Sequence, residues 1–259
     1  MKDKKIFAGV DAGTHSMKLV LLQGDGVLAS RVIPVQEEEL DPERAMEALL
    51  SEKNLSLKEL AFVVATGVGR NTIHFAGKVR SEQLCHAQGA HWYLPETRTV
   101  LDVGAEGTRA MKLNTQGNVQ DFACNSKCAA GTGAFVEVMA TLLEVPLAEV
   151  GEWAGRASER EKVSSYCTVF AESEVISLIH QGRSREAILA GVIQAVAERS
   201  FELLKKVGMR PRIALTGGTA KNSELRQILE EMADKEIICP PDPQVIGALG
   251  AALFARSSS

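Results

Sequence analysis

Short apolar runs separated by glycine-rich turns dominate the first third of the chain. Residues 5–35, KIFAGVDAGTHSMKLVLLQGDGVLASRVIPV, predict a strand that ends at Asp11, a glycine turn, a second strand over 18–22, a GDG turn and a third strand. Three such strands form a meander. A helix over residues 41–53 and a buried strand over residues 60–69, which ends in glycine, are expected to follow.

The same plan recurs in residues 98–125, RTVLDVGAEGTRAMKLNTQGNVQDFACN. Asp-x-Gly occurs at 11–13 and again at 102–104, each time at the end of a predicted strand and before a hairpin of similar length. A duplicated meander followed by helices predicts two similar α/β domains that face one another. We place the first domain at 1–95 and the second at 96–244, with the C-terminal helix at 245–259 free to pack back on the first.

The remainder of the second domain is predicted to be mostly helical from residue 131 to about 208. Residues 187–208, AILAGVIQAVAERSFELLKKVG, space apolar side chains for a long helix that closes with two lysines and a glycine. The chain then returns to an α/β pattern, with a strand at 212–218, a helix at 221–233 and a strand at 236–241. The predicted fold class is therefore α/β.

Composition and charge exclude several classes of function. The formal charge is −4 and the Lys and Arg residues are scattered, so neither nucleic acid nor an anionic membrane surface is an expected partner. The longest apolar run, VIGALGAALFA, is shorter than the roughly 20 residues of a membrane span. The N-terminus lacks a secretory signal pattern, so we expect a cytoplasmic protein. Five cysteines, an odd number, argue against a disulfide framework there.

Three glycine-bearing turns at strand ends form a candidate nucleotide site. Glycine lets backbone N–H groups approach phosphate, hydroxyl groups add donors, and aspartates can hold Mg²⁺ directly or through water. Neither a Walker A pattern nor a first-strand Gly-x-Gly-x-x-Gly is present, so neither the P-loop nor the Rossmann fold is supported. The candidate residues are Asp11, Gly13, Thr14, His15, Ser16 and Lys18, then Asp102, Gly104, Ala105 and Glu106, then Gly217 and Gly218.

Two cysteines head predicted helices. Cys128, in NSKCAAGTGAF, is expected near free backbone N–H groups at a helix start, which lower a thiol pKa and suit a ligand or a nucleophile equally. Cys167, in SSYCTVFAESEVISLI, heads another helix. Two thiolates cannot complete a four-cysteine iron–sulfur site, but two chains around a two-fold axis would supply four. The five histidines form no recognisable catalytic pattern with Cys128.

Other candidate residues allow two interpretations each. Cys124 lies four residues before Cys128, a spacing that allows a third ligand, although side chains on a strand end need not converge. Cys85 and Cys239 suit the role of small buried hydrophobic residues. Glu172 and Glu174 could support a cluster helix or reach Mg²⁺ and nucleotide, or could form a solvated helical face.

The order of the three turns resembles the actin, Hsp70 and sugar-kinase ATPase superfamily. In that superfamily two phosphate loops and a Gly-Gly adenosine loop close over ATP in a cleft between two domains. The resemblance implies that the residues at 11–18 match the first phosphate loop, Asp102 and Gly104 the second, and Gly217 and Gly218 the adenosine loop. It also implies that Lys18 contacts phosphate.

NSKCAAGTGAF and CTVFAESEVISL resemble the two signature segments of the BadF/BadG/BcrA/BcrD ATPase family, and the likeness extends to TGVGR at 66–70 and the terminal GALGAAL. This family comprises activators of 2-hydroxyacyl-CoA dehydratases and ATPase subunits of benzoyl-CoA reductases. The resemblance implies one [4Fe–4S] cluster held between two subunits by Cys128 and Cys167 of each. It also implies that Mg²⁺-dependent ATP binding and hydrolysis drive a low-potential electron into a partner iron–sulfur dehydratase or reductase. Reduced ferredoxin or flavodoxin is the implied donor.

The second phosphate loop departs from the pattern of dehydratase activators. They typically carry Asp-Ile-Gly-Gly-Gln-Asp, whereas this chain has DVGAEG, with Glu106 where water would be positioned. A glutamate there could orient or deprotonate water. The difference favours the benzoyl-CoA reductase ATPase subunits or the reductases of double-cubane proteins, in which case a homologous subunit could replace the second copy.

Two functions of other classes remain open from the sequence. A small-molecule kinase of the same superfamily would make no use of Cys128 or Cys167. A nucleotide sensor or scaffold would bind ATP through the altered DVGAEG loop without hydrolysing it.

Overall fold

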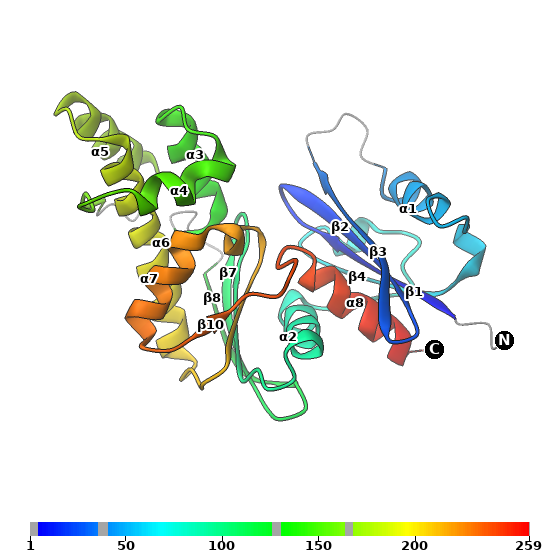
Figure 1. The fold of residues 1–259 in the computed structure, drawn as a ribbon. Helices are drawn as coiled ribbons and strands as arrows, with labels where there is room; N and C mark the ends of the chain where they lie inside the picture. The colour runs from blue at the N-terminus through cyan, green and yellow to red at the C-terminus, as the bar shows by residue number, and fades with distance from the viewer. Residues whose placement is uncertain (1–4, 36–40, 126–130, 164–167, 259) are drawn as a thin grey trace. The chain divides into compact units, whose positions relative to one another are not determined.

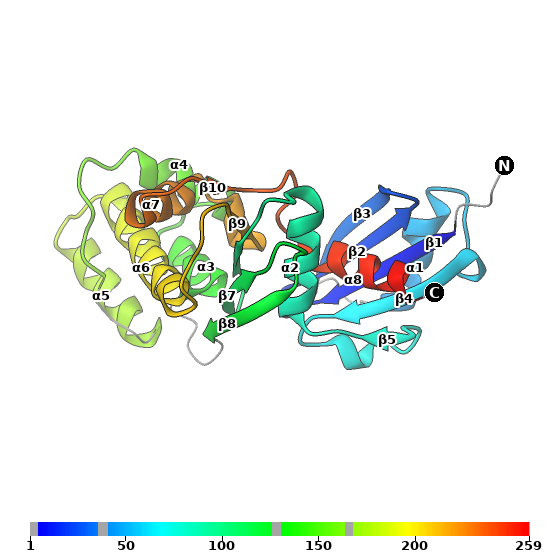
Figure 2. The ribbon, with the colours of Figure 1, turned by 90° about the horizontal axis from the view of Figure 1, so that it is seen from below.

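The computed structural model describes residues 5–35, 41–125, 131–163 and 168–258. The chain divides into two compact units. Each unit has its own mixed five-stranded sheet and its own helices (Figures 1 and 2). The first unit comprises Met1–Glu96, Leu113–Val119 and Pro240–Ser259, and the second comprises Thr97–Lys112 and Gln120–Cys239. The domain boundaries expected from the sequence stay a prediction.

The sheet of the first unit has the strand order β3-β2-β1-β4-β5. Strands β1 to β3 form an antiparallel meander, whereas β4 lies parallel to β1, and β5 parallel to β4. The strands are β1 (Ile6–Ala12), β2 (Ser16–Gln23), β3 (Gly26–Pro34), β4 (Leu60–Thr66) and β5 (Lys78–Val79).

Two helices of this unit, α1 and α8, lie on opposite sides of its sheet (Figures 1 and 2). Helix α1 begins where the Asp41 carboxylate accepts a hydrogen bond from the backbone N–H of Glu43 at 2.9 Å. Its apolar face includes Met46, Leu49 and Leu50, which are buried against side chains from β1, β2 and β4. The helices are α1 (Pro42–Ser51), α2 (Glu82–Tyr93) and α8 (Ile246–Ser257), with 3₁₀ turns η1 (Leu57–Glu59) and η2 (Arg70–Thr72).

Helix α8 approaches β1 and α2 so closely that only glycine fits at the contacts. A Cβ added to Gly9 of β1 would lie 1.9 Å from the carbonyl oxygen of Ala248. A Cβ on Gly250 would lie 1.8 Å from the carbonyl oxygen of Cys85 on α2. Since real Cβ atoms never come so near a carbonyl oxygen, these glycines set the depth to which α8 packs.

The second sheet repeats the plan of the first. Its order is β10-β9-β6-β7-β8, so β6 to β10 take the places of β1 to β5. Strand β6 pairs antiparallel with β7 and parallel with β9, and β9 pairs parallel with β10. The strands are β6 (Thr99–Val103), β7 (Thr108–Leu113), β8 (Val119–Asn125), β9 (Ile213–Thr216) and β10 (Ile237–Ile238). The predicted duplication of an α/β plan is therefore confirmed.

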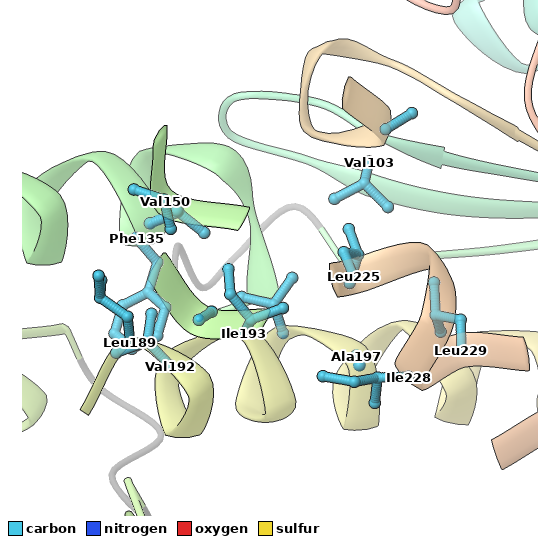
Figure 3. Packing of buried hydrophobic residues seen from close by; sticks show 14 of the residues in the cluster. Val103, Phe135, Val150, Leu189, Val192, Ile193, Ala197, Leu225, Ile228 and Leu229 are labelled. Atoms are coloured by element: carbon cyan, nitrogen blue, oxygen red, sulfur yellow. The ribbon is translucent and has the colours of Figure 1, made fainter. Parts of the chain in front are cut away.

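The helices of the second unit enclose its apolar core. Phe135 of α3, Ile193 of α6 and Leu225 of α7 are fully buried in this core (Figure 3). The long helix α6 begins where Ser184 Oγ accepts from the N–H of Ala187 and ends with two lysines, as the sequence predicts. The helices are α3 (Gly133–Leu142), α4 (Val150–Gly155), α5 (Thr168–His180), α6 (Arg185–Lys206) and α7 (Ser223–Ala233), with η4 (Leu147–Glu149) and η5 (Gly218–Lys221).

The helix expected directly after Cys128 would begin among residues that lie outside the described ranges. Helix α3 starts at Gly133, five residues beyond that cysteine, with Thr132 in an extended conformation before it. No helix among the described residues is long and apolar enough to cross a membrane.

Candidate functional site

A buried carboxylate lies at the end of β1. Asp11 is only 6% exposed, and its register partners are Lys18 on β2 and Thr66 on β4. The Lys18 ammonium lies 3.8 Å from Asp11 Oδ2. Because a buried carboxylate is costly without a nearby cation, the Lys18 ammonium offsets part of the cost of burying Asp11 at this strand end.

The turn between β1 and β2 places the other residues predicted for the first phosphate loop beside this pair. The N–H of Gly13 donates to the carbonyl oxygen of Ser16 at 3.1 Å, which closes the turn. A Cβ on Gly13 would lie 2.9 Å from Lys18 Nζ, so glycine leaves room for the ammonium group. Thr14 Oγ1 and His15 Nδ1 are 3.3 Å apart. The structure thus brings together all six residues predicted from Asp11 to Lys18.

An equivalent arrangement lies at the end of β6 in the second unit. The side chain of Asp102 is 3% exposed and pairs with Arg109 Nη1 at 3.1 Å. Thr216 of β9 donates from Oγ1 to Asp102 Oδ1 at 3.4 Å. In the sheet, Asp102 lies opposite Arg109 on β7 and Thr216 on β9, as Asp11 lies opposite Lys18 and Thr66 in the first unit.

The second turn resembles the first in detail. The N–H of Gly104 donates to the carbonyl oxygen of Gly107 at 2.9 Å. A Cβ on Gly107 would lie 3.0 Å from Arg109 Nη2, so the guanidinium covers this turn as Lys18 covers Gly13. Ala105 is half-buried and Glu106 is exposed, which leaves the Glu106 carboxylate accessible to solvent.

A glycine with positive φ follows each threonine. Gly67 has φ +91° and Gly217 has φ +93°. A Cβ on either would lie within 2.4 Å of a carbonyl oxygen, that of Ala12 for Gly67 and that of Val103 for Gly217. Each unit therefore carries a matching quartet of aspartate, cation, threonine and glycine, while Gly218 is exposed at the start of η5.

The sequence-based prediction did not include Arg109 and the two threonines as members of these quartets. A signal for Arg109 was present, because Arg109 follows Asp102 at the same spacing as Lys18 follows Asp11. The threonines come from strands distant in sequence. Only the repeated Ala-Thr-Gly at 65–67 and Leu-Thr-Gly at 215–217 indicated them.

The two predicted metal-ligating residues, Cys128 and Cys167, lie outside the described residues. Helix α5 begins at Thr168, directly after Cys167, as predicted. The N–H groups of Gly133 and Ala134 at the start of α3 are not free, because they donate to the carbonyl oxygens of Gly104 and Ala105. Within the described ranges, no group of three or more His, Cys, Asp or Glu side chains could hold a metal ion.

The other cysteines have contrasting environments. Cys85 is fully buried, and burial raises the pKa of its thiol to about 12. Burial also raises the pKa of the half-buried Cys239 thiol. Both are therefore protonated near neutral pH and fit the interpretation as small apolar residues. Cys124 is exposed on β8.

Glu172 and Glu174 are half-buried on α5. Their predicted support of a cluster helix or contact with Mg²⁺ and nucleotide stays a prediction.

Similar folds occur in nucleotide-binding proteins. A glucokinase of the ROK family from Streptomyces griseus, solved with glucose and AMPPNP, matches with a TM-score of 0.59 at 10% identity over 97% of this chain and 99% of that chain. At this identity the likeness shows the fold alone. It confirms the predicted α/β fold of the actin-like ATPases and sugar kinases.

Closer similarity is found to proteins of acyl-CoA metabolism. The activator of lactoyl-CoA dehydratase from Anaerotignum propionicum is 40% identical over 252 residues, 97% of each chain. A subunit of the benzoyl-CoA reductase from Thauera aromatica is 36% identical over 263 residues, 96% of this chain and 92% of that protein. The solved activator of 2-hydroxyisocaproyl-CoA dehydratase from Clostridium difficile, with bound ADPNP, superimposes with a TM-score of 0.93 at 38% identity over 98% of this chain and 95% of that chain.

Residues 8–255 match the family profile described as the BadF/BadG/BcrA/BcrD ATPase family. A match of this extent supports ATP binding and ATPase activity, and it agrees with the two quartets at the strand ends. The chain therefore belongs to the BadF/BadG/BcrA/BcrD ATPase family.

Proposed function

We propose that this chain is an ATP-driven reductive activase. It binds and hydrolyses Mg-ATP, and hydrolysis drives a low-potential electron from a [4Fe–4S] cluster shared by two chains into a partner iron–sulfur enzyme. The observation that carries the proposal is the pair of matching quartets in a chain of this ATPase family, each with a buried carboxylate and a cation beside a glycine turn.

Each phosphate loop offers its own set of ligands for the phosphates of ATP. Lys18 and Arg109 supply positive charge, and the N–H groups and hydroxyls of residues 13–16 supply donors. Asp11 and Asp102 already have cationic partners at 3.8 and 3.1 Å. They would therefore hold Mg²⁺ through its bound waters, since Mg²⁺ retains several waters in phosphate sites.

The exposed Glu106 is the proposed base of the hydrolytic reaction. Its carboxylate accepts a proton from the attacking water, a role that needs an accessible side chain beside the phosphate loop. Gly217 and Gly218, at the start of η5, are proposed to contact the adenosine.

Cys128 and Cys167 of each chain are the proposed ligands of the cluster. Thiolates are the ligands that [4Fe–4S] clusters require, and two chains, or one chain and a homologous subunit, supply four. The described structure supports a role of Cys167 as a ligand, because α5 begins at the next residue. The first-turn N–H groups of a helix are donors that stabilise negative charge, such as that of a thiolate. When bound, the cluster supplies one-electron chemistry at low potential.

The relatives indicate the class of partner. One is an activator of lactoyl-CoA dehydratase and another is a subunit of benzoyl-CoA reductase. We infer that the electron acceptor here is an iron–sulfur dehydratase or reductase acting on an acyl-CoA thioester, and that reduced ferredoxin or flavodoxin is the donor.

The proposal is tested by activation of such a partner under anaerobic conditions. The dithionite-reduced protein is mixed with a 2-hydroxyacyl-CoA dehydratase or the catalytic part of a benzoyl-CoA reductase, and turnover of the acyl-CoA is followed. We expect turnover with Mg-ATP, none with ADPNP, and at least a tenfold loss with Asp102→Asn. Activation that is equally fast without ATP would contradict the proposal. ATP consumption that rises on addition of a sugar or another small acceptor would support the kinase instead.

A further inference from the structure

The first two residues of α3 are hydrogen-bonded to the proposed second phosphate loop. The N–H of Gly133 donates to the carbonyl oxygen of Gly104 at 2.9 Å, and the N–H of Ala134 donates to that of Ala105 at 2.8 Å. The first N–H groups of a helix have no partner within the helix. At the start of α3 the loop provides these partners, so a shift of the loop is passed to the helix.

A third hydrogen bond is made by Thr108, the residue directly after this loop. Thr108, the first residue of β7, is 1% exposed, and its Oγ1 donates to the carbonyl oxygen of Gly131 at 2.6 Å. Gly131 is the third residue after Cys128. It is closely surrounded, because an added Cβ would lie 3.1 Å from Cβ and Cδ of Arg199 and 3.3 Å from Asn125 Nδ2.

Thr108 stands next to the cation of the second quartet. Side chains of successive strand residues point to opposite faces of the sheet. Arg109 contacts Asp102, while Thr108 contacts Gly131. The two neighbours thus join the carboxylate end of the proposed nucleotide site to Gly131, two residues before α3.

We propose that Thr108 is a positioning residue that couples nucleotide binding at the second phosphate loop to Gly131 and the start of α3. The inference rests on the proposed function and adds the contact through which the nucleotide acts on the start of this helix. Binding of phosphate at residues 104–107 shifts the start of β7, and the Thr108 hydroxyl carries this shift to Gly131.

The test uses the full chain without a cluster, so that it does not depend on redox activity. Amide hydrogen exchange of residues 131–142 is measured by mass spectrometry with and without Mg-ADPNP, and the affinity for ADPNP is measured by calorimetry. The variants are Thr108→Val, which removes the hydroxyl at nearly constant volume, and Thr108→Ser, which keeps it. Thr141→Val is the matched control, because Thr141 Oγ1 donates to a carbonyl within the same helix at 2.9 Å.

We expect ADPNP to slow exchange at residues 131–134 in the wild type, the Ser variant and the Thr141 control. In Thr108→Val this response is expected to fall at least fivefold, with the affinity for ADPNP within threefold of wild type. A Val variant that responds like the wild type would overturn the coupling role. So would an equal loss in the Val and Ser variants, since that result indicates packing rather than the hydroxyl.

The outcomes separate this inference from the proposed function. If the wild type binds ADPNP but exchange at residues 131–142 does not change, the coupling fails and the proposed ATPase stands. If the wild type does not bind ADPNP at all, the proposed function fails and the coupling fails with it.

Discussion

The guanidinium of Arg109 lies 3.1 Å from the carboxylate of Asp102 at the end of β6. The relationship repeats that of Lys18 and Asp11 at the end of β1, and the pairs occupy equivalent places in two sheets of the same plan. The duplication therefore extends from the topology to the charges of the site. It gives Arg109 the role in the second loop that Lys18 has in the first.

Arg109→Gln should destabilise the folded protein. It leaves Asp102, whose side chain is 3% exposed, without its cation, and breaking a buried ion pair in this way costs about 3 kcal/mol. Urea denaturation measures the loss.

Arg109→Lys should lose less stability than Arg109→Gln, and adding Asp102→Asn to Arg109→Gln should recover part of the stability. Arg156→Gln, which breaks an exposed pair with Glu152, is the control and should change stability by less than about 1 kcal/mol. An equal effect of Arg109→Gln and Arg156→Gln would contradict the prediction.

Gly217→Ala should be far more costly than Gly182→Ala. Both glycines have positive φ, +93° and +73°, so both substitutions strain the backbone by at least about 1 kcal/mol. Only the Cβ at 217 meets a carbonyl oxygen, that of Val103 at 2.4 Å, whereas the Cβ at 182 points into open space. We expect a loss of at least about 3 kcal/mol at 217 by thermal unfolding. Similar losses at the two positions would contradict the prediction, because they would show that the backbone near Val103 moves away from the new Cβ without loss of stability.

Glu106→Gln should lower kcat for ATP hydrolysis about 100-fold with little change in KM, since it removes a base without removing a phosphate ligand. Steady-state phosphate release measures both constants. Glu47→Gln, at an exposed position of α1, is the control for loss of a surface charge. An unchanged kcat in Glu106→Gln would assign activation of water to another residue.

Cys85 should resist alkylation in the folded protein. Burial raises its pKa from 9.0 to about 12, whereas Cys124 is exposed. With iodoacetamide at pH 8, peptide mapping should find label on Cys124 and none on Cys85 until denaturant is added. Rapid labelling of Cys85 in the native protein would contradict the burial of its thiol.

The same thiol predicts a loss of stability at high pH. The folded state holds the Cys85 proton to a higher pH than the unfolded state, whose pKa is near 9.0. The protonated Cys85 thiol therefore contributes fully to the stability of the folded state below pH 9, and this contribution is lost progressively as the pH rises towards about 12. Denaturation midpoints of wild type and Cys85→Ala over this range should converge as the pH rises. Parallel curves would contradict the prediction.

The meanders and the turn between β1 and β2 could be predicted because their signals are local. Alternation of apolar residues marks each strand, and Asp-x-Gly marks each turn. The pairing of Asp102 with Thr216 could not be predicted in this way. It depends on the parallel register of β6 and β9, which are separated in sequence by most of the second unit.

The start of α3 shows contacts that a local sequence pattern does not indicate. Helix α3 begins at Gly133. There the carbonyl oxygens of Gly104 and Ala105 accept hydrogen bonds from the first helical N–H groups, and these partners come from the turn between β6 and β7 rather than from neighbouring residues. A pattern confined to one segment cannot indicate such partners.

Iron and sulfide analysis of anaerobically purified protein tests the central claim most directly. We expect about four irons and four sulfides per two chains in the wild type and in Cys124→Ala. We expect them to be lost in Cys128→Ala and in Cys167→Ala while nucleotide binding is kept. Protein that hydrolyses ATP but contains no iron, or iron that is retained in both ligand variants, would contradict the account.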